Sequence, residues 1–298
     1  MTAALLKSSL EHLLMLGPAR WARRRVRGRT LVLAYHDIVP RGERPSGDRP
    51  LHLRQEEFGA QLDVLAREAD VISLAELDSG APRGRPRVVI TFDDAYAGAL
   101  TAGIEELSRR GLPATIFVAP GLLGRRDLWW DALADIGELT AATRERLLHE
   151  FRGEDSQVRS WARASGIDLS ASPAWAHGGT EEQLRAAVDA GCSLGTHSWS
   201  HPNLATLQQD ELREELVRPL TWLRERFPRA LPWMAYPYGL ESPGVRTATR
   251  AAGYVGAFLV GGGWMAAGDD RWALPRFNVS AGLSLAGFRI RLAGLLPG

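Results

Sequence analysis

Short apolar runs and amphipathic helical patterns alternate along most of the chain. Six apolar runs rich in β-branched or aromatic residues are predicted strands: Thr30–Tyr35, Arg87–Phe92, Ala114–Ala119, Cys192–Thr196, Trp233–Tyr236 and Val255–Val260. Apolar residues at helical spacing predict helices at Arg54–Arg67, Ala97–Arg110, Thr180–Ala190, Gln208–Phe227 and Pro243–Ala252. Strands that alternate with helices at this spacing predict an α/β fold, a parallel sheet or barrel with helices outside.

Residues 125–178 break this alternation. The segment is rich in Arg, Ala and Trp, has helical periodicity and contains no clear strand. We therefore predict a helical insertion at about 125–178, between two strands. Insertions at the catalytic end of a barrel often act as lids. The alternative is a helix pair that buttresses the outside of the barrel.

The N-terminal segment, residues 1–29, differs in charge from the main domain, residues 30–298. It carries seven basic residues and one acid, a net +6, so the rest carries −5 of the total +1. An amphipathic helix with Leu6, Leu10, Leu13 and Leu14 on one face is predicted to end at Gly17-Pro18. This pattern is typical of a helix that lies on an anionic membrane and, equally, of a helix that packs on the domain. With no signal peptide or transmembrane span predicted, we expect a cytoplasmic protein; if the helix lies on a membrane, the protein is peripheral at its inner face.

Composition narrows the functional classes. Of the 298 residues, 45% are hydrophobic and 24% charged, which predicts a packed core. The net charge of +1 argues against a polyanion-binding design, so no nucleic acid partner is expected. Cys192 is the single cysteine, which excludes an intramolecular disulfide and a Cys-rich zinc site. Lys7 is the single lysine, which argues against Schiff-base and P-loop chemistry.

Acidic and imidazole side chains follow two of the predicted strands. His197 and His201 come after Cys192–Thr196, and their H-x-x-x-H spacing lets two imidazoles converge on one metal ion. Asp93 and Asp94 follow Arg87–Phe92. A divalent cation would keep two neighbouring buried acids ionised, one as ligand and one as a proton acceptor. The alternative is that one of them caps the next helix.

Two further groups lie at predicted strand ends. The turn Tyr236-Pro237-Tyr238-Gly239 follows Trp233–Tyr236, and its free backbone N–H groups suit a developing oxyanion. His36 follows Thr30–Tyr35. Because the carboxyl ends of parallel strands share one edge, these groups are expected to form one site there.

The motifs TFDDAY, GTHSWSHPNL and AYPYG, in this order, resemble those of the polysaccharide deacetylase family, the NodB-homology group of carbohydrate esterase family 4. The resemblance covers roughly residues 30–280. It implies a distorted (β/α)7 barrel of the NodB-like kind. It also implies Asp94, His197 and His201 as metal ligands, Asp93 as catalytic base and the backbone of Tyr238 as oxyanion donor.

The chain departs from the commonest family pattern in two places. Ala235 and Tyr236 stand where many members have Arg, and no histidine follows His201 to serve as the usual acid. Tyr35-His36 and Leu274-Pro275-Arg276 are similar to a branch with an early Tyr-His motif. That branch implies His36 as general acid and Arg276 as the group that orients the base. Asp37, Asp269 and Asp270 are acids that we consider as partners of the His36 ring.

The implied reaction is metal-dependent hydrolysis of an N-acetyl group on an amino sugar of a poly- or oligosaccharide, free or lipid-linked, with release of acetate. The alternatives are hydrolysis of O-acetyl or formyl groups, and a non-catalytic saccharide-binding protein. The ligand set suits zinc, and also cobalt, nickel or iron. We expect Trp199, Tyr236 and Pro237 to contact the saccharide, and count Trp129, Trp130, Trp264 and Trp272 as sugar platforms or core. The remaining histidines are interpreted as surface or structural: His12, His52, His149 and His177.

Overall fold

A computed structural model describes residues 26, 28–79 and 85–295. Seven parallel strands close into a barrel in the order β1-β5-β6-β7-β8-β9-β11, with β11 pairing back to β1. The strands are β1 (Thr30–Tyr35), β5 (Arg87–Phe92), β6 (Thr115–Val118), β7 (Ser193–Thr196), β8 (Ala230–Ala235), β9 (Gly256–Gly262) and β11 (Leu274–Asn278). The predicted α/β barrel is confirmed.

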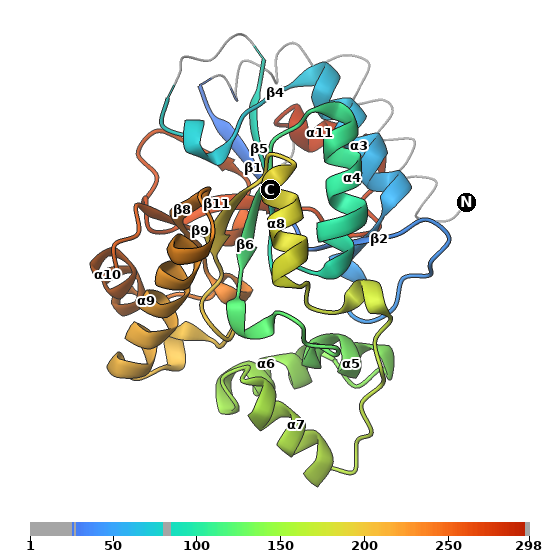
Figure 1. The fold of residues 1–298 in the computed structure, drawn as a ribbon, viewed down its shortest axis with the longest axis vertical. Helices are drawn as coiled ribbons and strands as arrows, with labels where there is room; N and C mark the ends of the chain where they lie inside the picture. The colour runs from blue at the N-terminus through green and yellow to red at the C-terminus, as the bar shows by residue number, and fades with distance from the viewer. Residues whose placement is uncertain (1–25, 27, 80–84, 296–298) are drawn as a thin grey trace.

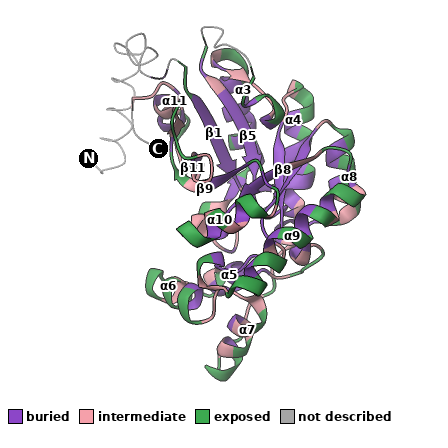
Figure 2. Ribbon diagram, turned by 90° about the vertical axis from the view of Figure 1, so that its left-hand side faces the viewer, coloured by how far each residue is buried: buried purple, intermediate pink, exposed green. Residues whose placement is uncertain are grey.

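Helices surround the barrel and turn their buried faces toward the strands (Figures 1 and 2). They are α3 (Gln55–Glu68), α4 (Ile104–Arg110), α8 (Glu181–Asp189), α9 (Gln209–Arg226), α10 (Pro243–Ala251) and α11 (Leu285–Leu292). A π-helical turn at Ala99–Gly103 leads into α4, which ends at Gly111 in the left-handed conformation that glycine adopts without steric cost.

The strand residues alternate between the barrel interior and the helices. On β1, Val32 packs with Phe117 and Phe258 in the interior cluster. Its neighbours Leu31 and Leu33 belong to the larger cluster, which includes residues of α3 and α4. Because side chains on a strand alternate in direction, one apolar strand fills both layers.

The seventh barrel strand, β11, was not among the six strands predicted from the pattern. Its second residue is Pro275, which cannot donate a ladder hydrogen bond. The pairing of β11 with β9 shifts register between Leu274 and Arg276, so the strand accommodates the proline at an irregularity. Four short strands were also missed: β2 (Asp37–Val39), β3 (His52–Arg54), β4 (Asp70–Val71) and β10 (Trp264–Met265).

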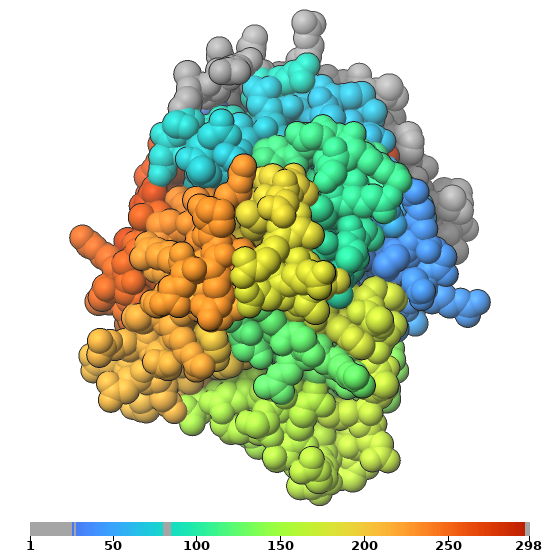
Figure 3. Space-filling model, viewed as in Figure 1, coloured from blue at the N-terminus to red at the C-terminus, as the bar shows by residue number. Residues whose placement is uncertain are grey.

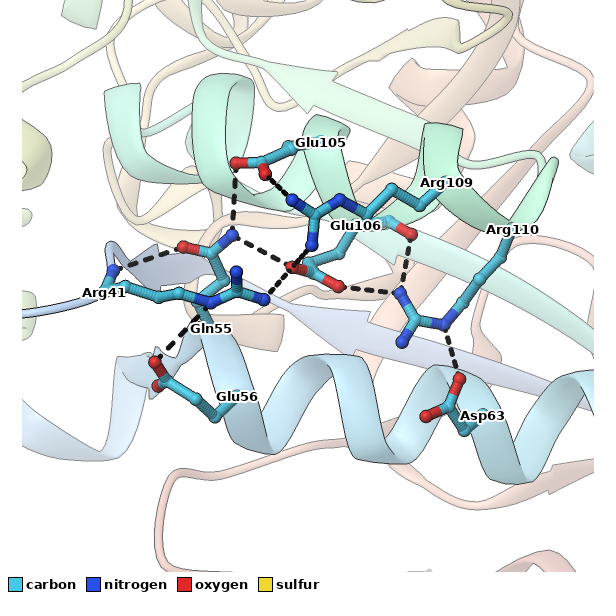
Figure 4. A network of polar contacts seen from close by, with 8 residues as sticks. All are labelled: Arg41, Gln55, Glu56, Asp63, Glu105, Glu106, Arg109 and Arg110. Atoms are coloured by element: carbon cyan, nitrogen blue, oxygen red, sulfur yellow. Dashed lines mark hydrogen bonds and ion pairs between the residues drawn. The ribbon is translucent and has the colours of Figure 1, made fainter.

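A buried carboxylate joins α3 to α4 on the outside of the barrel (Figure 4). Glu106 of α4 is 2% exposed and accepts hydrogen bonds from Gln55 at 3.0 Å, Arg41 at 2.8 Å and Arg110 at 2.7 Å. Arg110 also binds Asp63 of α3 at 2.7 Å. The cluster therefore stabilises the helix pair next to the strand that precedes Asp93.

The predicted insertion contains three helices, α5 (Trp129–Asp135), α6 (Ala141–Glu150) and α7 (Asp155–Ala164). They follow the carboxyl end of β6 and form a lobe at one end of the molecule, at the bottom of Figures 1 and 3. The amphipathic helix expected in residues 1–29 lies outside the described residues. In the described part of the chain, no helix is both long and apolar enough to span a bilayer.

Candidate active site

Residues from the carboxyl ends of the barrel strands surround one cavity of about 220 Å³. His36 follows β1, Asp93 and Asp94 follow β5, His197 follows β7, and Tyr238 follows β8. The cavity is lined by His36, Leu51, Asp93, Asp94, Trp130, Arg144, Leu148, His197, His201, Tyr236, Tyr238, Leu240, Val260 and Asn278. The structure thus brings together the polar groups that the sequence placed at separate strand ends.

Three side chains direct one ligand atom each toward a common point. Nε2 of His201 lies 3.1 Å from Nε2 of His197 and 3.2 Å from Oδ1 of Asp94, and Nε2 of His197 lies 3.5 Å from that same Oδ1. All three side chains are buried. Two imidazoles and one carboxylate are the ligand types that zinc and its neighbours take at catalytic sites, where further coordination positions stay open.

The protonation states of these groups suit a cation. Burial lowers the pKa of His197 and lowers that of His201 to about 4, so both rings are neutral at pH 7. Burial raises the pKa of Asp94, whose Oδ1 is buried without a hydrogen-bond partner. A cation beside this oxygen would favour the charged carboxylate. Nδ1 of His197 lies 2.7 Å from the carbonyl of Ala235, which leaves Nε2 free to act as ligand. The residues present therefore fit a divalent metal ion.

Asp93 has a different partner from Asp94. Arg276 of β11 binds its two carboxylate oxygens through Nη1 at 2.8 Å and Nη2 at 2.6 Å. The guanidinium also donates to Thr91 Oγ1 at 3.1 Å and to the Leu259 carbonyl at 2.6 Å, so its position is fixed. Burial alone would raise the pKa of Asp93, but Arg276 and the nearby histidines hold it well below its usual range. Asp93 is thus an oriented, ionised carboxylate beside the ligand cluster.

The helix-cap alternative for the acidic pair is wrong. Asp93 faces Arg276 and Asp94 faces the two histidines. The backbone N–H of Ala99, at the start of the following helical segment, is bound instead by Oδ1 of Asp37 at 3.0 Å.

Backbone strain is concentrated at this site. Among the described residues, six that are not glycine have positive φ: Asp94, Ala95, Arg152, Ser198, His201 and Tyr238. Asp94, His201 and Tyr238 line the cavity. Left-handed conformations cost non-glycine residues free energy and persist where the surrounding structure fixes them, commonly at functional sites.

The turn after β8 leaves a backbone donor at the cavity. Its hydrogen bonds run from Gly239 to the Tyr236 carbonyl and from Leu240 to the Pro237 carbonyl. Within the described part of the chain, no hydrogen bond from the Tyr238 N–H is present. Tyr238 has φ 59°, and its hydroxyl is buried without a partner. The turn therefore supplies an N–H group that a substrate oxygen can use.

Some expected contacts lie elsewhere. Trp199 does not line the cavity, because its ring lies against Arg218, with the guanidinium 3.6 Å from the ring centre. Pro237 is buried in the turn and does not line the cavity either, whereas Tyr236 does. The acids considered for the His36 ring have other partners: Asp37 binds His52, Asp269 accepts from the Ala266 N–H, and Asp270 binds Arg246. The charged groups that act on His36 are those of the site itself, including Asp93 and Asp94.

The insertion contributes one wall of the cavity. Trp130 comes from α5, and Arg144 and Leu148 come from α6. The sequence suggests Trp130 as one of several sugar platforms or core residues, but it gives no indication of Arg144 or Leu148. Their helical spacing indicates only a partly buried helix, so no local signal could have placed them at the site.

The chain is similar to known proteins in its sequence pattern and in its fold. A family model described as polysaccharide deacetylase matches residues 80–257, more than half of the chain. No curated protein sequence matches this chain significantly. Among solved structures, the Streptococcus pyogenes deacetylase PplD in complex with acetate has a TM-score of 0.62 at 16% identity, covering 89% of this chain and 98% of that one.

Two further structures are similar. IcaB from Ammonifex degensii has a TM-score of 0.61 at 19% identity, covering 90% of this chain and 97% of that one. A de-N-acetylase from Aggregatibacter actinomycetemcomitans has a TM-score of 0.62 at 15% identity, covering 88% and 99%. At these identities the likeness is one of fold, a NodB-like barrel. With the family match and the strand-end motifs, it identifies the chain as a member of the polysaccharide deacetylase family, whose members are hydrolases of the carbohydrate esterase family 4 type.

Proposed function

We propose that this protein uses a divalent metal ion to remove N-acetyl groups from amino sugars of a poly- or oligosaccharide, releasing acetate and a free amine. The observation that carries the proposal is the cluster of Asp94, His197 and His201, whose ligand atoms lie 3.1–3.5 Å apart beside the Arg276-held Asp93. A cation held there supplies Lewis-acid chemistry, polarising a carbonyl and making water more acidic. Zinc is the ion we propose, with cobalt, nickel and iron as alternatives.

The residues of the chain then divide the proton transfers between them. Asp93 accepts a proton from the water that attacks the acetyl carbon, since Arg276 holds its carboxylate ionised and oriented. The Tyr238 N–H donates to the carbonyl oxygen as negative charge develops on it. His36 delivers a proton to the nitrogen as the C–N bond breaks. Burial lowers the pKa of His36, so its ring is neutral beforehand; it accepts the proton that Asp93 has taken from water and passes it to the nitrogen, which returns Asp93 and His36 to their starting states.

The shape of the cavity supports a small acyl group on a larger substrate. Its volume of about 220 Å³ lies below the roughly 300–1,000 Å³ of pockets that enclose drug-sized ligands. Leu51, Leu148, Leu240 and Val260 provide apolar contacts for a methyl group. A saccharide chain would extend outside, past the partly exposed Arg144. An O-acetyl ester or a formyl amide would use the same residues.

Removal of the metal, and assays with saccharides that carry different acyl groups, test the proposal. We expect a chelator to abolish acetate release from N-acetylated oligosaccharides, and added zinc to restore it. Parallel assays with O-acetylated and N-formylated saccharides show which acyl group is removed, and whether it is bound to oxygen or to nitrogen. If acetate release persists after the bound metal has been removed, as checked by elemental analysis, the proposal is wrong.

Two substitutions separate the metal ligands from the base. His197→Ala is expected to lose both metal and activity while the fold, checked by circular dichroism, survives. Asp93→Asn is expected to retain metal but to lose about 100- to 10,000-fold in rate, the range for general-base catalysis. Full metal occupancy in His197→Ala, or a normal rate in Asp93→Asn, would contradict these assignments.

We also propose that residues 1–29 attach the protein to the cytoplasmic face of a membrane, where a lipid-linked saccharide is a suitable substrate. The net +6 charge and the leucine face of this segment support the proposal. Deleting residues 1–28 should abolish co-sedimentation with anionic vesicles and leave turnover of a soluble oligosaccharide unchanged. If the shortened protein unfolds, the segment belongs to the domain instead.

A further inference from the structure

A buried histidine outside the cavity lies between two carboxylates. Nδ1 of His52 is 3.0 Å from Oδ2 of Asp37, and Nε2 is 2.8 Å from Oδ1 of Asp131. The three side chains are 0–1% exposed. Burial alone would lower the pKa of His52, but the hydrogen bonds to Asp131 and Asp37 raise it to about 10. The ring is therefore a buried cation in the neutral pH range, on the short strand β3.

The remaining bonds of the carboxylates tie three parts of the fold together. Oδ1 of Asp37 accepts from the N–H groups of Ile38 at 2.8 Å and Ala99 at 3.0 Å. Oδ1 of Asp131 also accepts from the Asp48 N–H at 2.9 Å. Gly47 packs so closely there that an added Cβ would lie 2.6 Å from Asp131 Oδ1. The two-stranded sheet of β2 and β3, the helix that follows Asp94 and helix α5 of the insertion thus meet at His52.

A hydrogen-bond chain leads from this cluster to the cavity. The Tyr96 hydroxyl donates to Oδ2 of Asp131 at 2.8 Å and accepts from Nε1 of Trp130 at 2.6 Å. The Trp130 ring lines the cavity and lies 5.0 Å from the ring of His201. His52 therefore contacts a cavity residue through two intermediates, while itself lying outside the cavity.

His201 depends on this packing more than His197 does. The second ring nitrogen of a metal-binding histidine is normally hydrogen-bonded, which fixes the ring. His197 meets this rule through the Ala235 carbonyl, but Nδ1 of His201 is buried without a partner. The orientation of the His201 ring is therefore set by its neighbours: Trp130, Tyr238 at 4.4 Å and His197 at 4.7 Å between ring centres.

We infer that His52 is a positioning residue for the catalytic centre: through Asp131 and Tyr96 it fixes Trp130 against His201, and so holds the insertion and one metal ligand in the working arrangement. The inference rests on the proposed metal site. It assigns a functional role to a histidine that has no motif context in the sequence.

Metal affinity is the readout that separates positioning from general stability. Zinc dissociation constants are measured by chelator competition on the full-length metal-free protein, for the wild type, His52→Gln and Tyr96→Phe. We expect roughly 10- to 100-fold weaker zinc binding in both variants, the usual range for residues that orient metal ligands. The kcat should fall with little change in KM. In the double variant, the two effects should be less than additive, because both break one chain of contacts.

Control variants exclude unspecific effects. His149→Gln changes an exposed histidine of the same insertion and should bind zinc normally. Val64→Ala removes buried volume from α3 and supplies a destabilised protein with an intact site. If His52→Gln does not fold, Tyr96→Phe still tests the proposal, because it removes the hydroxyl that links Asp131 to Trp130 and leaves the Asp37–His52–Asp131 cluster in place.

The possible failures are distinguishable. If the wild type binds no zinc, cobalt, nickel or iron, the proposed metal site is wrong, and this inference is wrong with it. If the wild type binds metal and Tyr96→Phe binds it equally well with an unchanged kcat, the proposed function stands and the positioning role of His52 is overturned. A loss of zinc affinity in Val64→Ala as large as in His52→Gln would also overturn it.

Discussion

Arg276 and Asp93 meet through two parallel hydrogen bonds although 183 positions separate them in the chain. The arginine side chain is fully buried and the carboxylate 2% exposed. The pair joins the last barrel strand to the carboxyl end of β5. Because a planar guanidinium binds a carboxylate in one geometry, it fixes the direction in which Asp93 faces the cavity.

Replacing this arginine should impair catalysis more than metal binding. We expect Arg276→Gln to lower kcat by about 100-fold, the effect of a misplaced catalytic group. Without the adjacent cation, the pKa of Asp93 rises, so the acid limb of the pH–rate profile should move to higher pH. Arg276→Lys keeps the charge but not the two-pronged geometry, and should retain part of the rate. Rates and metal content measured from pH 4 to pH 9 test this, and an unshifted acid limb in Arg276→Gln would contradict it.

A substitution at Glu106 should change stability but not catalysis, because Glu106 lies outside the cavity. Glu106→Gln removes a buried carboxylate that accepts from Gln55, Arg41 and Arg110 (Figure 4). We expect the free energy of unfolding to fall by about 1–3 kcal/mol, since the arginines lose a charged acceptor and one of the two oxygens becomes an amide donor. The kcat and zinc affinity should stay at wild-type values. Urea unfolding and steady-state kinetics check both expectations, and a loss of zinc affinity would show that α4 influences the metal site.

The buried His52 predicts a pH dependence of stability. Its pKa is raised from 6.5 to about 10 in the folded state. The folded protein therefore holds a proton that the unfolded chain has released between these pH values, so the contribution is fully present below pH 6.5 and is lost as pH rises toward 10. The slope from this group is about −1.4 kcal/mol per pH unit. Chemical unfolding of the wild type and His52→Gln should show curves that converge at high pH; parallel curves would contradict the ionised state.

Much of the site was predictable because its residues sit in local motifs at strand ends. Asp93 and Asp94 directly follow one apolar run, and His197 directly follows another. A residue in this position lies at the carboxyl edge of the barrel, whichever strands are its neighbours. Six of the seven barrel strands follow from the same pattern. The strand β11 does not follow from this pattern, because Pro275 interrupts it. The conformation of β11 is determined by closure of the barrel, which is a long-range property.

Residues that act through packing had no such signal. His52 has no motif around it, and its partners Asp37 and Asp131 lie 15 and 79 positions away. Trp199 lies between His197 and His201 in the sequence, yet the strained backbone at Ser198, with φ 62°, leads into a loop in which Trp199 packs against Arg218. Sequence proximity to a cavity residue therefore did not predict a place in the cavity.

His36 lines the cavity at the end of β1, and the charged groups that act on its ring are those of the site itself. Burial lowers its pKa, while Asp93 and Asp94 act in the opposite direction. A neutral ring beside two carboxylates is suited to take up a proton during the reaction and pass it on.

His36→Ala should therefore retain metal and lose about 100- to 10,000-fold in kcat on an N-acetylated sugar, because an amine cannot leave without a proton. The loss should be far smaller on an activated aryl acetate, whose phenolate leaves unprotonated. His177→Ala is the matched control, since among the described residues the ring of this half-buried histidine bonds only to the Ser172 carbonyl. Equal losses on the amide and the activated ester would mean that His36 supports the cavity wall and that another group supplies the proton.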